Sequence, residues 1–240
     1  MKTTISMILC ICLVASLQSC VFNSFNAVKG NKNILIEEVA ISEYNKIDFG
    51  GSAQITYEQK ADAEPYLKIE IDENLFPLLQ INTDNNTLSI SSKENLHPSR
   101  YVIYTNSKEL AEIYGRGSTN IYLKGTLQTE NLKINLSGSG KIQADNITCN
   151  NLNTSTSGSG NIKVAGKANE ISSSVSGSGK IDALEMESNI VRCSVSGSGN
   201  FDVNAMQELD VKISGSGTIK YKGEPTIKKS IAGSGKILKY

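Results

Sequence analysis

The sequence predicts an all-β fold, a right-handed parallel β-helix (β-solenoid) with about 18–20 residues per turn and irregular N-terminal coils. Three observations support this prediction. The motif SGSG recurs at a nearly constant spacing, apolar and polar residues alternate after every copy, and the chain is rich in Ser, Thr, Asn and Ile, with 20 Gly and no Trp. That composition suits short strands and tight turns, and a period near 20 is typical of coils that bury their apolar side only against a neighbouring coil.

The N-terminus has the pattern of a targeting segment. An apolar stretch over residues 5–17 is too short to cross a bilayer as a helix but has the length of the hydrophobic part of a signal peptide. Residues 17–20, Leu-Gln-Ser-Cys, resemble the lipobox of bacterial lipoproteins, although Gln is unusual at its position. We predict a signal peptide over residues 1–19, lipid on Cys20 and a flexible, lipid-anchored tether over residues 20–33. An ordinary signal peptide cleaved nearby is the alternative.

Lipid on Cys20 would attach the protein to a membrane without spanning it. Val21 is not the Asp that retains lipoproteins at the inner membrane, so we expect an outer membrane lipoprotein of the cell envelope. The acidic signal that surface-exported lipoproteins carry close behind the Cys is lacking. A periplasmic and a surface-facing position therefore both stay open.

The SGSG motif divides the rest of the chain into repeats. Its copies begin 20, 19, 20 and 18 residues apart, and an AGSG variant follows after another 18 residues. The starts are Ser137, Ser157, Ser176, Ser196, Ser214 and Ala232. We predict a solenoid domain over residues 34–240, with irregular N-terminal coils over 44–136 and SGSG repeat coils over 137–240. A separate N-terminal β-domain is the alternative.

Apolar residues recur at fixed offsets from each motif. The residue five positions after each start is always apolar, and the residue just before it is apolar in five of six copies. The first set is Ile142, Ile162, Ile181, Phe201, Ile219 and Ile237, and the second is Leu136, Thr156, Val175, Val195, Ile213 and Ile231. Period-two alternation predicts a buried column on each side of the motif. If the alternation continues through the motif, both glycines face inward and both serines face outward.

The outward serines are the candidate binding face. Equivalent residues of adjacent coils lie about 4.8 Å apart in such a stack, so the serines would form ladders along it. Hydroxyl groups that bond to one another explain these ladders without a ligand. A flat polar face offered to a glycan or a protein is the functional interpretation. The candidate residues are Ser139, Ser159, Ser178, Ser198, Ser216 and Ser234.

The N-terminal half carries a weaker version of the same pattern. Residues 49–57 and 114–123 look like degenerate coils, and alternation predicts strands between them at 67–71, 79–83, 87–90 and 101–105. Asn85-Asn86 is typical of a tight turn between two of these strands. Residues 72–79 have room for one short helical turn. We expect these coils to cap the solenoid, because an open end would expose strand edges and core.

Of the five cysteines, only Cys149 and Cys193 belong to the predicted solenoid. They fall two coils apart, so their separation is at least about 9 Å on the strand spacing. A disulfide needs Cα atoms within about 7 Å. We therefore predict two free thiols, buried as small apolar side chains.

These motifs together resemble the GIN domain, a family described as the head of auto-transporter adhesins and common in envelope proteins of the Bacteroidetes. The resemblance covers the chain from about Tyr44 to Leu238. Its most specific features are Phe49–Ser52, Glu73–Leu75, the serial SGSG turns and the closing run from Ile213 to Gly235. It implies the fold and an adhesin label, and it assigns no binding or catalytic residue.

The charge balance and the motifs argue against several function classes. Lys plus Arg and Asp plus Glu number 24 each, so the formal net charge is zero and no overall positive charge attracts nucleic acid. Asp182 and Asp202 each stand six residues after the start of their motif, on adjacent coils. Their carboxylates could therefore lie about 5 Å apart, which is the spacing in retaining glycosidases. Lys163 and Lys220 share the same offset, so a solvated charge stripe is the simpler interpretation. His97 stands alone, and no pattern of a metal, cofactor or nucleophile site is present.

We therefore predict a non-enzymatic protein without a cofactor. One hypothesis is a binding or adhesion module for a glycan or protein ligand, and the other is a structural envelope protein that forms a homo-oligomer through its solenoid faces. A polysaccharide-active enzyme is the weaker third. The absence of Trp and an aromatic content of 6% count against a sugar-stacking cleft.

Overall fold

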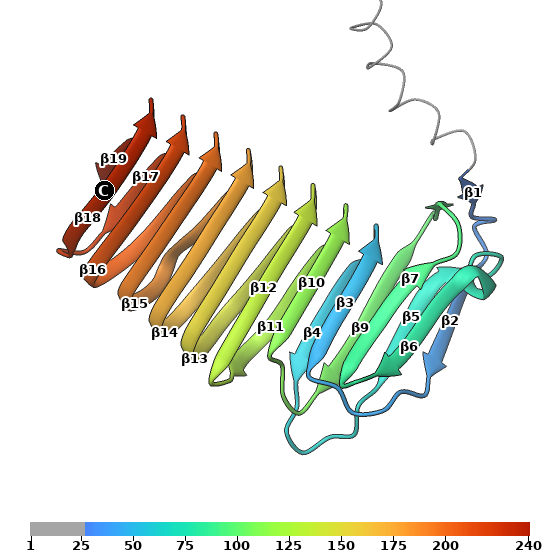
Figure 1. The fold of residues 1–240 in the computed structure, drawn as a ribbon. Coiled ribbons are helices and arrows are strands. Elements are labelled where there is room, and N and C mark those ends of the chain that lie inside the picture. Colours follow the sequence, from blue (N-terminus) through green and yellow to red (C-terminus); the bar gives the residue numbers. More distant parts are fainter. Residues whose placement is uncertain (1–26) are drawn as a thin grey trace, which may run out of the picture.

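The computed structural model describes residues 27–240, in which 17 strands form one continuous stack and two short strands form a separate pair (Figure 1). The predicted signal peptide and Cys20 lie outside the described residues. No helix in the described part of the chain is long and apolar enough to cross a membrane.

The strands follow one another with short connections. The N-terminal half holds β1 (Val28–Lys29), β2 (Ile34–Val39), β3 (Lys46–Gly51), β4 (Gln54–Gln59), β5 (Leu67–Asp72), the 3-10 turn η2 (Phe76–Leu78), β6 (Leu79–Asp84), β7 (Thr87–Ser92), β8 (Leu96–His97), β9 (Tyr101–Ser107), β10 (Glu112–Gly117), β11 (Asn120–Gln128) and β12 (Asn131–Gly138). The repeat half holds β13 (Lys141–Gly158), β14 (Asn161–Gly177), β15 (Lys180–Gly197), β16 (Asn200–Gly215), β17 (Thr218–Lys222), β18 (Thr226–Gly233) and β19 (Lys236–Lys239). The predicted helical turn is η2, and the predicted strands correspond to β5, β6, β7 and β9.

Each coil turns at its Gly-Ser motif, which we call the Gly-Ser corner. The strands that end at the corner form the first face: β3, β10, β12, the second halves of β13 to β16, and β18. The strands that begin after it form the second face: β4, β11, the first halves of β13 to β16, β17 and β19. All of these pairs are parallel, and equivalent repeat residues lie beside one another, as the solenoid prediction requires.

The predicted columns are buried between the two faces. Ile142, Ile162, Ile181, Phe201 and Ile219 are at most 1% exposed, and only Ile237 of the last coil is partly exposed. The column before the motif is buried from Leu136 to Ile213, and its last member, Ile231, is 39% exposed. The last member of each column is therefore partly exposed, because no further coil packs on the C-terminal coil in the described structure.

The two glycines of each motif have different roles, which corrects the prediction that both face inward. The second is the buried one: a Cβ on Gly179 would lie 2.7 Å from the carbonyl oxygen of Gly160 and 2.8 Å from the Cγ2 of Thr156. The first lies at the corner itself, and Gly177 has a φ of 112°. Its Cβ would lie 2.6 Å from the carbonyl oxygen of Gly158 in the preceding coil. The pleat is interrupted there, because a positive φ turns the chain from one face to the other.

The N-terminal coils belong to the same stack, but they also contain antiparallel strands. β3 and β4 pair in parallel with β10 and β11, whereas β2, β5 and β9 pair antiparallel on the second face. β6 and β7 form a hairpin whose turn residues, Asn85 and Asn86, have φ values of 50° and 59°, as the tight-turn prediction expects. The sheet is thus continuous from one half to the other.

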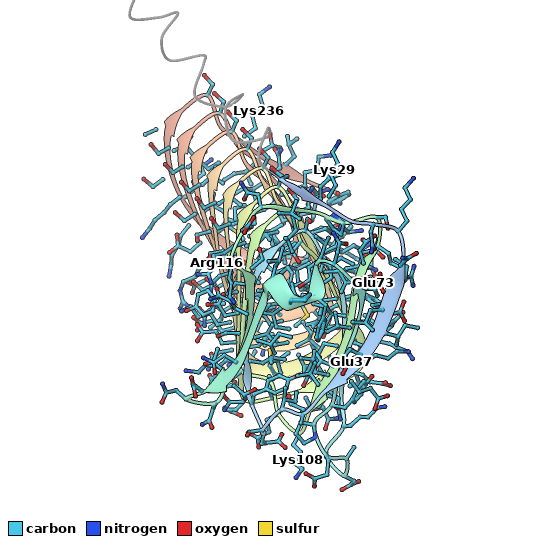
Figure 2. The ribbon with its side chains drawn as sticks, turned by 90° about the vertical axis from the view of Figure 1, so that its right-hand side faces the viewer. Lys29, Glu37, Glu73, Lys108, Arg116 and Lys236 are labelled. Atoms are coloured by element: carbon cyan, nitrogen blue, oxygen red, sulfur yellow. The ribbon has the colours of Figure 1, made fainter. Side chains whose placement is uncertain are left out.

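The first described residues are held on the N-terminal end, which η2 crosses (Figure 2). β1 pairs with β8, and the backbone N–H of Lys32 donates to Oδ1 of the buried Asp72 at 2.6 Å. The flexible tether was predicted to reach Asn33. That prediction is wrong for residues 28–33, because their backbone groups are hydrogen-bonded to the solenoid.

Candidate binding face

The first face carries a field of uncharged polar side chains in the middle of the repeat coils. We call it the serine face; it comprises Asn135, Ser137, Asn153, Ser155, Ser157, Ser172, Ser174, Ser176, Ser194 and Ser196. Its members lie in adjacent columns of β12 to β15, in register from strand to strand. All are exposed or partly exposed. Most of these residues lie outside the SGSG motif. Runs such as Ser155-Thr156-Ser157 and Ser172-Ser173-Ser174 were the sequence signal for them.

The alternation of the strands places these side chains outward. On β13, Leu152, Thr154 and Thr156 face the core, so Asn153, Ser155 and Ser157 between them face solvent. Two inward hydroxyls satisfy each other, since the Oγ1 of Thr154 and the Oγ of Ser173 lie 2.6 Å apart in the core. The backbone ladders on both sides hold the main chain of these strands in place, so the positions from which the outward side chains project are fixed.

The six predicted serines form an exposed row along the Gly-Ser corner. We call them the corner serines. Each donates its backbone N–H to the carbonyl oxygen of the first glycine in the preceding coil, at 2.9–3.0 Å. Among the hydrogen bonds of residues 27–240, none joins two corner-serine hydroxyls, in contrast to the interpretation that these groups bond to one another. The corner serines border the serine face, so the predicted ladder is one edge of a wider polar surface.

Charged groups lie at both borders of the serine face. Toward the N-terminal coils, Nζ of Lys133 lies 2.7 Å from Oε1 of Glu112 and donates to the hydroxyl of Tyr114 at 3.0 Å. The ion pair with Glu112 and the hydrogen bond to Tyr114 raise the pKa of Lys133, with Glu112 as the larger cause. Toward the C-terminal coils, Arg192 pairs with Glu170. Between these pairs the surface offers hydroxyl and amide groups.

Tyr114 gives the serine face one aromatic neighbour. It is half-buried on β10, directly beside Asn135, and the ammonium of Lys133 lies 5.3 Å from its ring centre. The Nδ2 of Asn135 is buried without a hydrogen-bond partner, while its Oδ1 accepts from Ser155 at 2.7 Å. A ring, an amide and a series of hydroxyls thus follow one another along the stack.

The two alternative sites of the sequence are built differently. Asp182 and Asp202 lie side by side, between Lys163 and Lys220 as predicted. Asp202 is 8% exposed, and its Oδ2 lies 2.5 Å from Nζ of Lys180, which raises the pKa of Lys180. This arrangement is a column of charged side chains in which Asp202 is ion-paired with Lys180. His97 is exposed on β8, beside a hollow of about 460 Å³ that Gly51, Ser52 and Gly117 also line. Within residues 27–240, no group of three His, Cys, Asp or Glu residues could hold a metal ion.

Cys149 and Cys193 are free thiols, as predicted. Cys193 is buried in the inward column of Ser173, and burial raises the pKa of its thiol. Cys149 is only partly buried; burial, and to a lesser extent Glu130, raises its pKa to about 11. Both thiols therefore stay protonated near neutral pH and are poor nucleophiles.

Comparisons with known proteins agree with this architecture. A family model described as "Putative auto-transporter adhesin, head GIN domain" matches residues 43–225. A crystal structure of a putative lipid binding protein from Parabacteroides distasonis is 39% identical, with a TM-score of 0.77 over 90% of this chain and 100% of that one. A putative adhesin from Bacteroides fragilis is 31% identical, with a TM-score of 0.85 over 89% of this chain and 100% of that one. No curated protein matches the chain.

Proposed function

The chain belongs to the GIN-domain family of adhesin heads, and on that premise we propose that it is a non-enzymatic binding module of the cell envelope whose serine face holds a neutral glycan. The observation that carries this proposal is the uncharged field of hydroxyl and amide groups on β12 to β15. Names given to the relatives, adhesin and lipid-binding protein, both describe binding.

The chemistry of the serine face suits a sugar polymer. A hydroxyl can donate and accept, which matches the hydroxyls of a glycan without a fixed charge. The groups repeat about every 4.8 Å along the stack, so one polymer could engage several coils. Each contact is weak, and simultaneous contacts multiply the affinity. Because the backbone ladders already hold the main chain of the face in place, little backbone conformational entropy is lost on binding.

The borders of the face favour a neutral ligand. Lys133 and Arg192 are each paired with a carboxylate, so neither offers a free cation to an anionic polymer. The exposed Lys212, beside Ser194, shares its side of β16 with Asp210. The ring of Tyr114 beside Asn135 provides a surface on which one sugar ring could stack. We propose that the bound polymer ends at this ring.

A matched pair of substitutions tests the serine face. The binding of neutral oligosaccharides by the purified chain would be screened on an array and measured by calorimetry. Ser174→Asp puts a carboxylate in the middle of the face and should weaken binding at least tenfold, on the order of 1.4 kcal/mol. Asn161→Asp adds the same charge to the same strand on the second face and should leave binding unchanged.

Three outcomes would contradict the proposal: no neutral glycan is bound, both variants lose binding equally, or the chain binds phospholipid vesicles in a manner that Ser174→Asp does not alter. The last outcome would favour lipid binding, which is the activity that the name of the Parabacteroides distasonis relative describes. Unaltered thermal unfolding of both variants is the control for correct folding.

We further propose that lipid on Cys20 anchors the module at the outer membrane, with residues 20–27 as the tether. The lipobox-like sequence and the envelope setting of the family support this anchor. Cys20→Ala should release the protein from the membrane fraction, and a variant that still fractionates with membranes would contradict the proposal. Protease added to whole cells would then establish the side: digestion indicates the surface, and protection indicates the periplasm.

A further inference from the structure

The exposed apolar side chains of the solenoid gather at its two ends. Of eight large hydrophobic residues that are exposed in the described structure, six lie on the first or last strands of the stack. Ile34 and Ile36 lie on β2, and Ile227, Ile231, Leu238 and Tyr240 lie on or directly after β18 and β19. Apolar groups at the ends of a stack mark surfaces that another chain could cover.

The two ends also carry opposite charges. Residues 27–45 and 60–100, which build the N-terminal end, contain ten acidic and six basic side chains. Residues 218–240 at the C-terminal end contain six Lys and a single Glu. The chain is neutral as a whole, yet its two ends differ in the sign of their charge. Figure 1 shows that these ends lie at opposite sides of the stack. Glu37 and Glu38 on β2 are exposed, as are Lys236 and Lys239 on β19, and Lys239 is ion-paired with Glu224.

Each end presents strand edges that no other described strand covers. On the second face, β2 pairs only with β5 and β19 only with β17. On the first face, β6 pairs only with β7 and β18 only with β16. All eight residues of β18 are exposed. Such edges offer free backbone N–H and C=O groups to a further strand.

We propose that the C-terminal end of one copy docks on the N-terminal end of the next, so that β2 of the second copy continues the second face beyond β19. The strand directions permit this. β2 is antiparallel to β5, which is antiparallel to β9, and β9 is parallel to β4 and thereby to all strands of the second face. A second copy shifted along the axis therefore brings β2 alongside β19 in parallel.

The side chains of the two strands match in one register. Ile237 faces the core of its coil, as Leu35 does opposite the buried Ile71, so these two would share the core column. Leu238 and Ile36, both exposed, would then lie side by side on the outer surface. The next pair would bring Glu37 beside Lys239, which is ion-paired with Glu224 within its own copy, on the same side of the strands as Leu35 and Ile237. A single alignment thus matches the core column and the apolar surface, and it adds Glu37 to the existing ion pair.

The charges also select against the other arrangements. Two C-terminal ends would oppose Lys to Lys, and two N-terminal ends would oppose Glu to Glu, so only unlike ends attract. Lysines on an exposed edge usually prevent strand pairing. Here they prevent pairing between identical ends and leave the head-to-tail contact open. A head-to-tail contact is heterologous, and it produces open chains of copies when it does not close into a ring.

Charge reversal tests the contact in solution. Sedimentation velocity of the purified full chain over a range of concentrations should reveal association, weaker at high salt because the end charges are screened. Glu37→Lys with Glu38→Lys, and separately Lys236→Glu with Lys239→Glu, should each raise the concentration at half-association by tenfold or more. Lys141→Glu with Lys163→Glu reverses two exposed lysines in the middle of the second face and should leave it unchanged.

A mixture of the two end variants provides the decisive measurement. In an equal mixture, each reversed end finds a reversed partner of opposite sign, so alternating chains of copies should form again. The proposal is overturned by a wild-type chain that stays monomeric, by association that survives in the end variants, or by a mixture that fails to restore it. Circular dichroism of every variant establishes that the fold is retained.

Discussion

The N-terminal coils and the repeat coils are held together by different means, although they belong to one sheet. The N-terminal core contains large side chains, among them Tyr44, Phe49 and Tyr57, and it buries the carboxylate of Asp72. The repeat coils contain mostly Ile, Val and Ala, with Phe201 as their one fully buried aromatic side chain in the described structure. Specific contacts thus close the N-terminal end, whereas the repeat half is held by the stacking of equivalent residues, coil on coil.

This difference determines what each half tolerates. In a stack of equivalent coils, neighbouring coils approach one another most closely at the corner glycines. The stability of the stack therefore depends on these residues. An irregular cap depends on individual hydrogen bonds between segments that are distant in the sequence. Substitutions at a corner and in the cap should therefore destabilise the protein by distinct physical mechanisms.

The largest effect is expected at a corner glycine. Gly177→Val forces a branched residue to a φ of 112° and places its Cβ against the carbonyl oxygen of Gly158. Over-packing costs about 1–3 kcal/mol and backbone strain a similar amount, so the free energy of unfolding should fall by about 2–6 kcal/mol. Urea denaturation measures it. A loss below 1 kcal/mol, on the order of an ordinary surface change, would mean that the corner is not the closest approach.

A smaller loss is expected in the cap. Oδ1 of Asp72 accepts from the backbone N–H of Lys32 and the hydroxyl of Ser99, and Oδ2 accepts from the N–H of Ser99 at 2.7 Å. Asp72→Asn turns one acceptor into a donor that faces other donors, at a cost of about 2–3 kcal/mol. Hydrogen exchange should lose protection in β2 and β5 and keep it in β14 and β15. Asp84→Asn, at an exposed carboxylate, is the control.

The same carboxylate makes the cap sensitive to acid. Burial alone would raise the pKa of Asp72, but the hydrogen bonds from Ser99, Lys32 and Arg100 outweigh it and hold the pKa below its usual value. A carboxyl group with a lowered folded pKa stabilises the protein above its unfolded pKa, about 3.9, and loses that contribution as the pH falls through the folded value. The difference in stability between wild type and Asp72→Asn should therefore shrink below about pH 4. A difference that grows with acid would exclude this role.

The sequence predicted the repeat half more fully than the cap. Alternation around SGSG located both buried columns, because every coil repeats the same local pattern. The antiparallel course of β2 and the docking of residues 28–33 depend on partners some 30 to 70 residues away, such as Glu37 beside Ile69, and no local pattern specifies them. The first glycine of each motif was misplaced because alternation assumes an extended backbone, which a positive φ interrupts. The sequence predicted only part of the serine face, because the regular SGSG motif marks the corner serines at its edge and most members of the face lie outside that motif.

An intermediate effect is expected within the repeat core. Thr154→Val leaves the hydroxyl of Ser173 buried without its partner and should cost about 1–2 kcal/mol. Adding Ser173→Ala removes the unpaired group, so the double variant should recover most of that loss. A double-mutant cycle measures the coupling. If the losses of the two single variants simply add, the hydroxyl pair does not act as a unit, and the repeat core is less uniform than its stacking suggests.

The smallest effect is expected one residue away from the largest. Ser178 follows Gly177 at the same corner, but its side chain is exposed, and only its backbone N–H takes part in the stack, donating to Gly158 at 2.9 Å. Valine keeps that N–H, so Ser178→Val should change the free energy of unfolding by no more than about 0.5 kcal/mol. Thermal and urea denaturation beside Gly177→Val measure the contrast directly. Equal losses for the two variants would mean that the corner serines, rather than the glycines, hold neighbouring coils together.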